Sequence, residues 1–566
     1  MQKSDIVLTQ LIRSSAVRAI AKPRSKPASV FEFPPISQPI AALVAAVVLM
    51  PLVYLVIRAV GAGSESLDYL LRARTVGIIT NSLLLTVAVT FSAALIGVPF
   101  AWLTTRAKMR FRRVWLILGL LPMVIPSYLG AVTLIAVFGP RGELQSLLEP
   151  LGVTRLPSIY GFVGAWLSVT LFTYPYVMLP VRAALMNLDP ALEESAYSLG
   201  LSRWHVFRRV ILPQLRPALA AGMLLAALYA LSDFGAVTMM RYNVFTRAIY
   251  LQYTSSFDRS RAAVLALVLI VITLGILAIE RRVALNMRNY RAGTGTQRAY
   301  RPVTLRRMKI PAYVFMGTVV TIGVIVPLVM MVSWLIRGLN ANIVAGDLAA
   351  PLVNTVSASS AAALTVGLLS IPFAILAVRS TSHFNHGLVK VAYLGSVLPG
   401  LVVALALVFF ATRYAHSWYQ TFPILIVGYA IRFLPFSIGA TRSAFTQINP
   451  RYEDAARCLG LNSWQVTWRI TTPLARAGIL AGMALVFLSV MKELPTTLLL
   501  APTGFNTFAT RIWSAYDAGS LARIGAPALI LVAVSALSLY FILHHETYKN
   551  PRWHRNGKRG LLRGQR

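Results

Sequence analysis

The chain has 566 residues, of which 57% are hydrophobic and 13% charged, and its formal net charge is +36. Together with a mean hydropathy of +0.67, this composition excludes a soluble domain of the same length. The sequence therefore predicts an all-α integral membrane protein.

About 20 apolar residues are needed for a helix to cross a membrane, and twelve such stretches follow one another along the chain, six before residue 284 and six after 310. We predict spans over 40–57, 79–103, 114–138, 159–181, 217–240, 262–279, 311–335, 353–378, 391–411, 422–441, 478–500 and 525–543. The corresponding domains are a cytoplasmic tail (1–39), a first six-helix domain (40–283), a basic cytoplasmic linker (284–309), a second six-helix domain (310–545) and a basic tail (546–566).

Charged residues are distributed unequally between the two predicted sides of the membrane. With loops assigned alternately, the side that holds both termini carries 39 Lys and Arg against 9 Asp and Glu, whereas the opposite side carries 13 against 7. This is the positive-inside bias, and it predicts that both termini are cytoplasmic. The membrane topology explains the excess of Lys and Arg. We therefore expect the chain to contact a lipid bilayer and not to bind nucleic acid.

A segment of thirty residues occurs twice. Residues 193–222 read EESAYSLGLSRWHVFRRVILPQLRPALAAG, and residues 453–482, which lie 260 positions later, read EDAARCLGLNSWQVTWRITTPLARAGILAG. An internal repeat of this length indicates two copies of one unit. Six spans per unit is an even number, so the two repeats are parallel, whereas the inverted repeats of many secondary transporters need an odd number.

The duplication extends beyond this segment with a second spacing. Asn81, Pro99, Arg106 and Pro126 match Asn354, Pro372, Arg379 and Pro399 at 273 positions, whereas Pro175 and Arg182 match Pro435 and Arg442 at 260. The first half therefore holds thirteen extra residues, which we place in the predicted external loop GPRGELQSLLEPLGVTRLPS. The prolines in or near spans predict kinks that the two halves share.

Helix signals give each copy of the repeat a local shape. Asp189 and Asn449 are N-capping residues, and each precedes a proline suited to the first helical position. Gly200 and Gly460 are C-terminal stop signals. Each copy is thus predicted to form a short cytoplasmic helix, a glycine turn and a second helix that leads into the next span. Such an element either caps the helix bundle or contacts another protein, and these signals leave both interpretations open.

The acidic start, the Ala-Ala or Ser-Ala pair, the following glycine and the trailing helix resemble the EAA loop of permease subunits of bacterial ABC importers. The first copy departs from that pattern with Glu-Ser-Ala. The resemblance covers essentially the whole chain. It is strongest to the fused, twelve-span permease of ferric-iron importers, and the segments that carry this subfamily resemblance are LSDFGAVTMMRYNVFTRAIY (231–250) and MKELPTTLLLAPTGFNTFATRIW (491–513). Fused permeases for thiamine and for phosphonate compounds look similar.

This resemblance implies a type I-like permease in the bacterial inner membrane, with two copies of an ABC ATPase subunit and a periplasmic or external binding protein as partners. It implies that the ATPase-coupling loops contain Glu193, Glu194, Ala196, Gly200, Leu201, Glu453, Asp454, Ala455, Ala456, Gly460 and Leu461. A secondary transporter is the alternative from another class.

No catalytic or cofactor motif is found. A phosphate-binding loop is absent, because the only Gly-Lys pair, Gly557-Lys558, lacks the glycine-rich lead and the hydroxyl residue. The single cysteine, Cys458, excludes a cysteine-based metal cluster, and the histidines are scattered. We therefore expect no enzyme activity, no bound metal and no cofactor in this chain, and ATP hydrolysis in a separate subunit.

Four charged residues fall inside predicted spans: Asp233, Arg432, Lys492 and Glu493. Asp233 and Glu493 are 260 positions apart and thus occupy equivalent places in the two halves. An uncompensated charge at that depth costs at least roughly 2.5 kcal/mol, so each should be paired or face water. Either the two carboxylates border a central path for a cation, or they belong to an ion-paired scaffold with Arg432 or Lys492.

Overall fold

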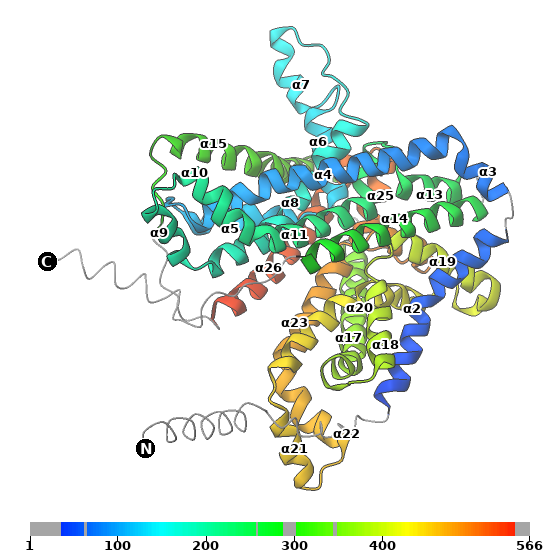
Figure 1. The fold of residues 1–566 in the computed structure, drawn as a ribbon. Coiled ribbons are helices and arrows are strands. Elements are labelled where there is room, and N and C mark those ends of the chain that lie inside the picture. The colour runs from blue at the N-terminus through cyan, green and yellow to red at the C-terminus, as the bar shows by residue number, and fades with distance from the viewer. Residues whose placement is uncertain (1–35, 62–64, 256–258, 287–301, 343–347, 549–566) are drawn as a thin grey trace, which may run out of the picture.

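The computed structural model describes residues 36–61, 65–255, 259–286, 302–342 and 348–548 (Figure 1). Helices make up nearly all of the regular structure in these ranges, and one isolated β-bridge joins Ala107 and Val303. The prediction of an all-α protein is confirmed. Most of each predicted tail (1–39 and 546–566) and most of the linker (284–309) lie outside the described residues.

The helices of the two halves follow the same order. The first half contains α2 (Ser37–Val60), α3 (Glu65–Leu71), α4 (Ala73–Thr105), α5 (Arg112–Leu120), α6 (Ser127–Phe138), α7 (Glu143–Leu148), α8 (Phe162–Asn187), α9 (Pro190–Ser198), α10 (Arg203–Val206), α11 (Leu212–Ser232), α12 (Gly235–Met239), α13 (Phe245–Thr254) and α14 (Arg259–Asn286). The second half contains α15 (Lys309–Val320), α16 (Val326–Asn340), α17 (Ala349–Arg379), α18 (His383–Leu394), α19 (Gly400–Tyr414), α20 (Phe422–Gln447), α21 (Pro450–Cys458), α22 (Ser463–Val466), α23 (Thr472–Met491), α24 (Pro495–Leu500), α25 (Phe508–Asp517) and α26 (Gly525–Tyr548).

Within the described ranges, nine helices are long and apolar enough to cross a membrane, and the pair Arg112–Met123 and Ser127–Leu151, bent by 99°, makes a tenth if it is one span. Each of these ten regions overlaps one of the twelve predicted spans. The other two predictions, 391–411 and 525–543, overlap the shorter apolar helices Gly400–Tyr414 and Leu521–Leu537.

Four predicted spans are interrupted: 217–240 and 478–500 break at Asp233 and Lys492, and the other two break at a proline. The break in 114–138 falls at Pro126 and the break in 391–411 at Pro399, and both prolines have extended backbone immediately before a new helix. A proline ring blocks the hydrogen bond that would continue the preceding helix, but suits the start of the next one. Pro99 and Pro372, by contrast, lie inside α4 and α17. At Pro126 and Pro399, where the sequence predicts kinks, the two halves therefore share a break between two helices.

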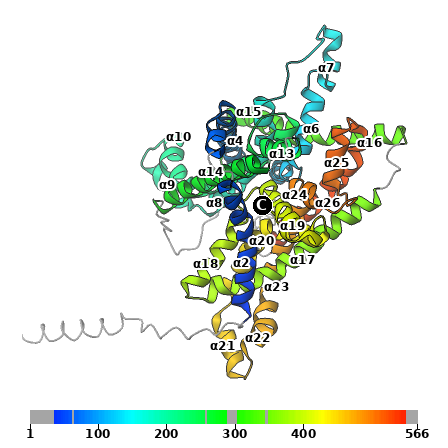
Figure 2. The ribbon, with the colours of Figure 1, turned by 90° about the vertical axis from the view of Figure 1, so that its right-hand side faces the viewer.

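The first span of each half packs against the other half. Helix α2 contacts α17, α18 and α19 of the second half, and α15 and α16 contact α5 and α6 of the first. Figures 1 and 2 both show α2 beside α18. The halves are therefore joined by exchanged helices as well as by the contacts between their central spans.

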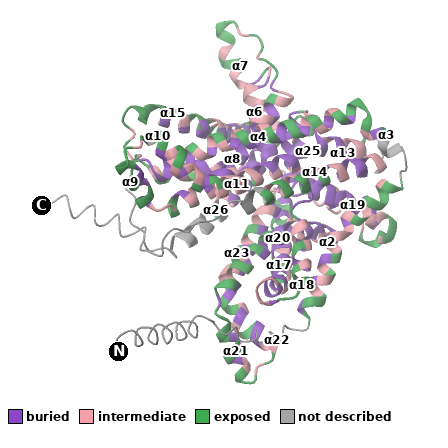
Figure 3. Ribbon diagram, in the orientation of Figure 1, coloured by how far each residue is buried: buried purple, intermediate pink, exposed green. Residues whose placement is uncertain are grey.

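Side chains on the outer surfaces of the spans are apolar. On α4, for example, Leu84, Phe91 and Leu95 are 53%, 60% and 72% exposed. Buried residues concentrate on inner helices such as α8 and α20 (Figure 3). An exposed apolar surface on long helices is suited to contact with lipid chains.

Equivalent polar contacts fix α13 and α25 in the two halves. Asn81 Nδ2 donates to the carbonyl oxygen of Asn243 (3.2 Å), and Asn354 Nδ2 donates to that of Asn506 (3.1 Å). Asn243 and Asn506 are 263 positions apart (506 minus 243). The internal symmetry therefore continues after the thirty-residue repeat with a third spacing.

Candidate functional site

Each copy of the repeat forms a capped helix at the end of one arm of the molecule (Figure 1). The side chain of Asp189 accepts a hydrogen bond from the Ala191 amide (3.0 Å) at the start of α9, and that of Asn449 accepts one from the Arg451 amide (3.1 Å) at the start of α21. The helices begin where the sequence signals predict, because a capping side chain satisfies an amide that the helix cannot.

A glycine turn ends each of these helices. Gly200 and Gly460 have φ of +80° and +86°, in the left-handed region that glycine adopts without a steric penalty. The turn places Leu199 and Leu459 at the tip of each arm, where they are 82% and 84% exposed. The two arms therefore expose the same apolar residue at the same point.

The first acidic residue of each loop points inward. Glu193 is 5% exposed and lies 3.1 Å from Nη1 of Arg106, while Glu453 is 1% exposed and lies 3.2 Å from Nε of Arg379. Arg106 and Arg379 are at the cytoplasmic ends of α4 and α17 in the predicted topology. Burial raises the pKa of Glu193, and the Arg106 guanidinium acts in the opposite direction. The ion pairs thus attach the loop helices to long spans.

The other residues of the predicted coupling set divide between two faces. Ala196 and Ala456 are buried with the glutamates, and Leu201 and Leu461 are half-buried. Glu194, Asp454 and Ala455 are exposed with the glycines. Two aromatic residues of the repeat, Trp204 and Trp464, are 64% and 49% exposed. The sequence matched these tryptophans without indicating that they are accessible.

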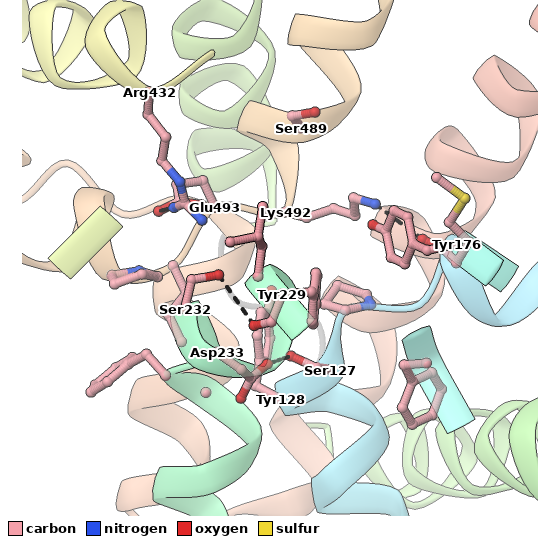
Figure 4. Close-up of a pocket in the computed structure, with 18 of the residues that line it drawn as sticks. Ser127, Tyr128, Tyr176, Tyr229, Ser232, Asp233, Arg432, Ser489, Lys492 and Glu493 are labelled. Atoms are coloured by element: carbon pink, nitrogen blue, oxygen red, sulfur yellow. Dashed lines mark hydrogen bonds and ion pairs between the residues drawn. The ribbon is translucent and has the colours of Figure 1, made fainter. Parts of the chain in front are cut away.

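A cavity of about 280 Å³ lies between the two halves (Figure 4). All four charged residues that the sequence placed inside spans line it: Asp233, Arg432, Lys492 and Glu493. The three tyrosines that share the cavity are Tyr128, Tyr176 and Tyr229.

Asp233 lies at the break between α11 and α12. Its carboxylate accepts hydrogen bonds from the Ser127 hydroxyl and from the amides of Ala236 (3.0 Å) and Val237 (3.3 Å). Amides at a helix start stabilise a negative charge. The described contacts of the Asp233 carboxylate are therefore with neutral donors, one hydroxyl and two amides.

Glu493 has a different partner in the equivalent place. It forms an ion pair with Arg432, and the Thr496 hydroxyl donates to the same oxygen (2.7 Å). Gly400 occupies the position that Ser127 has in the first half, 273 residues earlier. A β-carbon on Gly400 would lie 2.6 Å from the Glu493 carboxylate and 2.8 Å from the Thr496 hydroxyl. The glycine therefore leaves room for the Arg432 guanidinium.

Lys492 crosses the cavity from the second half to the first. Its Nζ donates to the carbonyl oxygen of Met123 (3.1 Å), next to the bend at Pro126. Among the residues that the structure describes, no carboxylate pairs with Lys492. Of the two partners considered for Glu493, the structure shows Arg432.

Aromatic rings join the halves beside the cavity. Phe234 stacks on Trp513 with centroids 5.2 Å apart, and Tyr250 meets the edge of Trp513 at 6.3 Å. Tyr250 and Trp513 are 263 positions apart and are thus equivalent residues of the two halves. In the described ranges, no group of three or more His, Cys, Asp or Glu side chains could hold a metal ion.

Comparison with known proteins agrees with this two-fold arrangement. The family described as "binding-protein-dependent transport system inner membrane component" matches residues 93–288 and 370–545. The chain belongs to this family. Each matched segment contains one copy of the repeat and one cavity carboxylate. The chain is therefore a fused, two-domain importer permease and a multi-pass inner-membrane protein.

Individual relatives match over different lengths. The "Fe(3+)-transport system permease protein FbpB 2" of Haemophilus influenzae is 32% identical over 87% of this chain and 95% of its own length. The "Ferric transport system permease protein FbpB" of Actinobacillus pleuropneumoniae is 24% identical over 82% of this chain and 71% of its own. The "Probable sulfate transport system permease protein cysT" of Chlorella vulgaris is 32% identical over only 36% of this chain, and 79% of its own.

Proposed function

We propose that this permease imports ferric iron, which a periplasmic or external binding protein delivers and a separate ABC ATPase drives inward. The observation that carries the substrate assignment is the 32% identity to a relative named as an Fe(3+)-transport permease, over nearly the full length of both chains. The similarity to a sulfate permease covers about a third of the chain and carries less weight.

The two loop helices are the sites where ATPase subunits act, one subunit on each. Support comes from their equivalence, from the exposed tips at Leu199 and Leu459, and from the ion pairs that join them to α4 and α17. A force on the tip reaches a long span directly through these pairs. Both termini and both loops are cytoplasmic in this proposal, in agreement with the positive-inside bias.

The cavity is the central part of the transport path. Ferric iron favours oxygen ligands, and the cavity contains carboxylate and serine oxygens from both halves and phenol oxygens from the first half. Asp233 and Glu493 guide the cation, while Arg432 holds Glu493 in place. Alternating access requires only that contacts between the halves differ in the two states.

Reconstitution tests this proposal. The permease is placed in proteoliposomes with its ATPase and its binding protein, and ⁵⁵Fe uptake is measured with and without internal ATP. Uptake should require both ATP and the binding protein, and excess thiamine, phosphonate or sulfate should not compete. Uptake driven by an ion gradient without ATP would support a secondary transporter instead.

The path residues are tested separately. Asp233→Asn and Glu493→Gln keep the shape of each side chain and remove its charge, so uptake should fall while protein abundance stays normal. Asp68→Asn changes an exposed carboxylate on α3 and is the control. Normal uptake by both cavity variants would show that Asp233 and Glu493 do not guide the cation.

A further inference from the structure

The thirteen extra residues of the first half belong to a folded projection, which we name the outer insert (139–160). It contains α7, extends away from the spans in both views (Figures 1 and 2), and is closed by local hydrogen bonds. Gln145 Nε2 donates to the Val153 carbonyl oxygen (3.0 Å), and the Leu156 amide donates to that of Pro140 (3.1 Å). A hydrogen-bonded insert of this kind presents a defined surface.

A second cavity, of about 610 Å³, lies between the outer insert and α16. Three arginines line it: Arg141 and Arg155 from the insert and Arg337 from α16. Arg337 pairs with Glu143 (2.6 Å), whereas neither insert arginine has an ion-pair partner among the described residues. The cavity therefore has an excess of positive charge on the predicted outer side of the membrane.

A buried hydrogen-bond donor also faces this cavity. Trp334 on α16 is 1% exposed and lines the cavity, and its indole N–H has no hydrogen-bond acceptor within the part of the chain that the structure describes. A buried donor is normally paired. Arg141, Arg155 and the Trp334 indole are therefore donors around this cavity for which the described residues supply no negatively charged acceptor.

We propose that this cavity binds an acidic side chain of the external binding protein, and that the outer insert fixes the orientation in which that protein docks. The inference rests on the proposed function. A carboxylate matches the charge of the arginines that line the cavity. At the end of the insert, Leu147 and Leu151 are 75% and 77% exposed and supply an apolar contact beside the charged one.

The asymmetry of the chain gives this docking a direction. The second half is thirteen residues shorter at the equivalent place, so a partner that spans both halves meets the insert on one side only. An anionic lipid headgroup offers the same acceptor chemistry. The insert extends away from the spans (Figures 1 and 2), which favours a partner outside the bilayer over a lipid headgroup.

The test uses the reconstituted permease, ATPase and binding protein described above. In the double variant Arg141→Gln/Arg155→Gln, the binding-protein concentration that half-maximally stimulates ATP hydrolysis should rise about tenfold or more, with a weaker dependence on salt. Hydrolysis without binding protein should not change. The matched control is Arg413→Gln at the exposed end of α19 in the second half, where the half-maximal concentration should stay at its wild-type value.

A conservative variant and a second contact keep the result interpretable. Arg141→Lys/Arg155→Lys should restore most of the response, and Leu147→Ser/Leu151→Ser should weaken docking without changing its salt dependence. An unchanged half-maximal concentration in the Gln double variant overturns the proposal. A defect that follows the anionic lipid content of the vesicles overturns it in favour of a lipid site. If the binding protein does not stimulate even the wild type, the proposed function itself fails.

Discussion

Removing the Arg106 guanidinium should uncouple the first loop helix from transport. In Arg106→Met the buried Glu193 carboxylate loses the ion pair at 3.1 Å. Breaking a buried pair by removing one partner costs about 3–5 kcal/mol. At about 1.4 kcal/mol per factor of ten, the docked position of α9 would become roughly 10²-fold to 4 × 10³-fold less favourable relative to a position in which Glu193 reaches water.

The second half provides an internal comparison. Glu453 also accepts a hydrogen bond from the Thr471 hydroxyl (3.0 Å), and the residue 260 positions earlier is Ile211, which cannot donate one. Arg379→Met should therefore be less damaging than Arg106→Met. The double variant Arg106→Met/Glu193→Gln should recover part of the function, since no charge is left buried and unpaired.

The assay measures ⁵⁵Fe uptake and ATP hydrolysis in the same proteoliposomes. Arg106→Met should lower uptake at least tenfold while hydrolysis continues, so that the ratio of iron moved to ATP used falls. Co-purification of the ATPase separates uncoupling from detachment. Wild-type uptake by Arg106→Met at normal abundance, or an equal defect in the double variant, would refute the role given to this ion pair.

Three further predictions concern the loops and the cavity. Gly200→Leu and Gly460→Leu strain the left-handed turn by about 1–2 kcal/mol, so they should uncouple hydrolysis from uptake or release the ATPase in a pull-down; normal transport would disprove the coupling assignment. Gly400→Val should displace the Arg432 guanidinium and abolish uptake, whereas Gly439→Val, whose β-carbon meets open space, should not. Lys492→Met should increase the rate at which cysteines engineered in the two halves cross-link; an unchanged rate argues against a contact that restrains the halves.

The sequence predicted best those structural features that residues close together in the chain determine. The starts of α9 and α21 follow from a capping side chain before a proline, and their ends follow from glycine, so both ends are local events. The inward direction of Glu193 and Glu453 could not be predicted in this way. Their arginine partners lie far back in the chain, 74 positions in the case of Arg379 and Glu453. The only available signal was that both arginines recur at one spacing.

The prolines show a second limit of local reasoning. Pro99 and Pro126 have the same chemistry, yet α4 continues through the first and a new helix starts at the second. In a membrane protein, a proline inside a helix is tolerated where neighbours satisfy the freed carbonyl. That condition depends on packing between distant spans, and a pattern along the chain does not contain it.

The two halves share a backbone plan but not the charges of the cavity. Arg432 and Lys492 replace Phe172 and Ser232 of the first half, so the second half contributes both cations. The first half contributes Asp233, which hydroxyl and amide groups stabilise instead. In the proposed path, a cation is therefore attracted more strongly toward the first half. Because Lys492 also donates to the Met123 carbonyl, any separation of the halves changes the position of its charge relative to Asp233. The proposed movement of the halves would thus change the electrostatic field in the cavity.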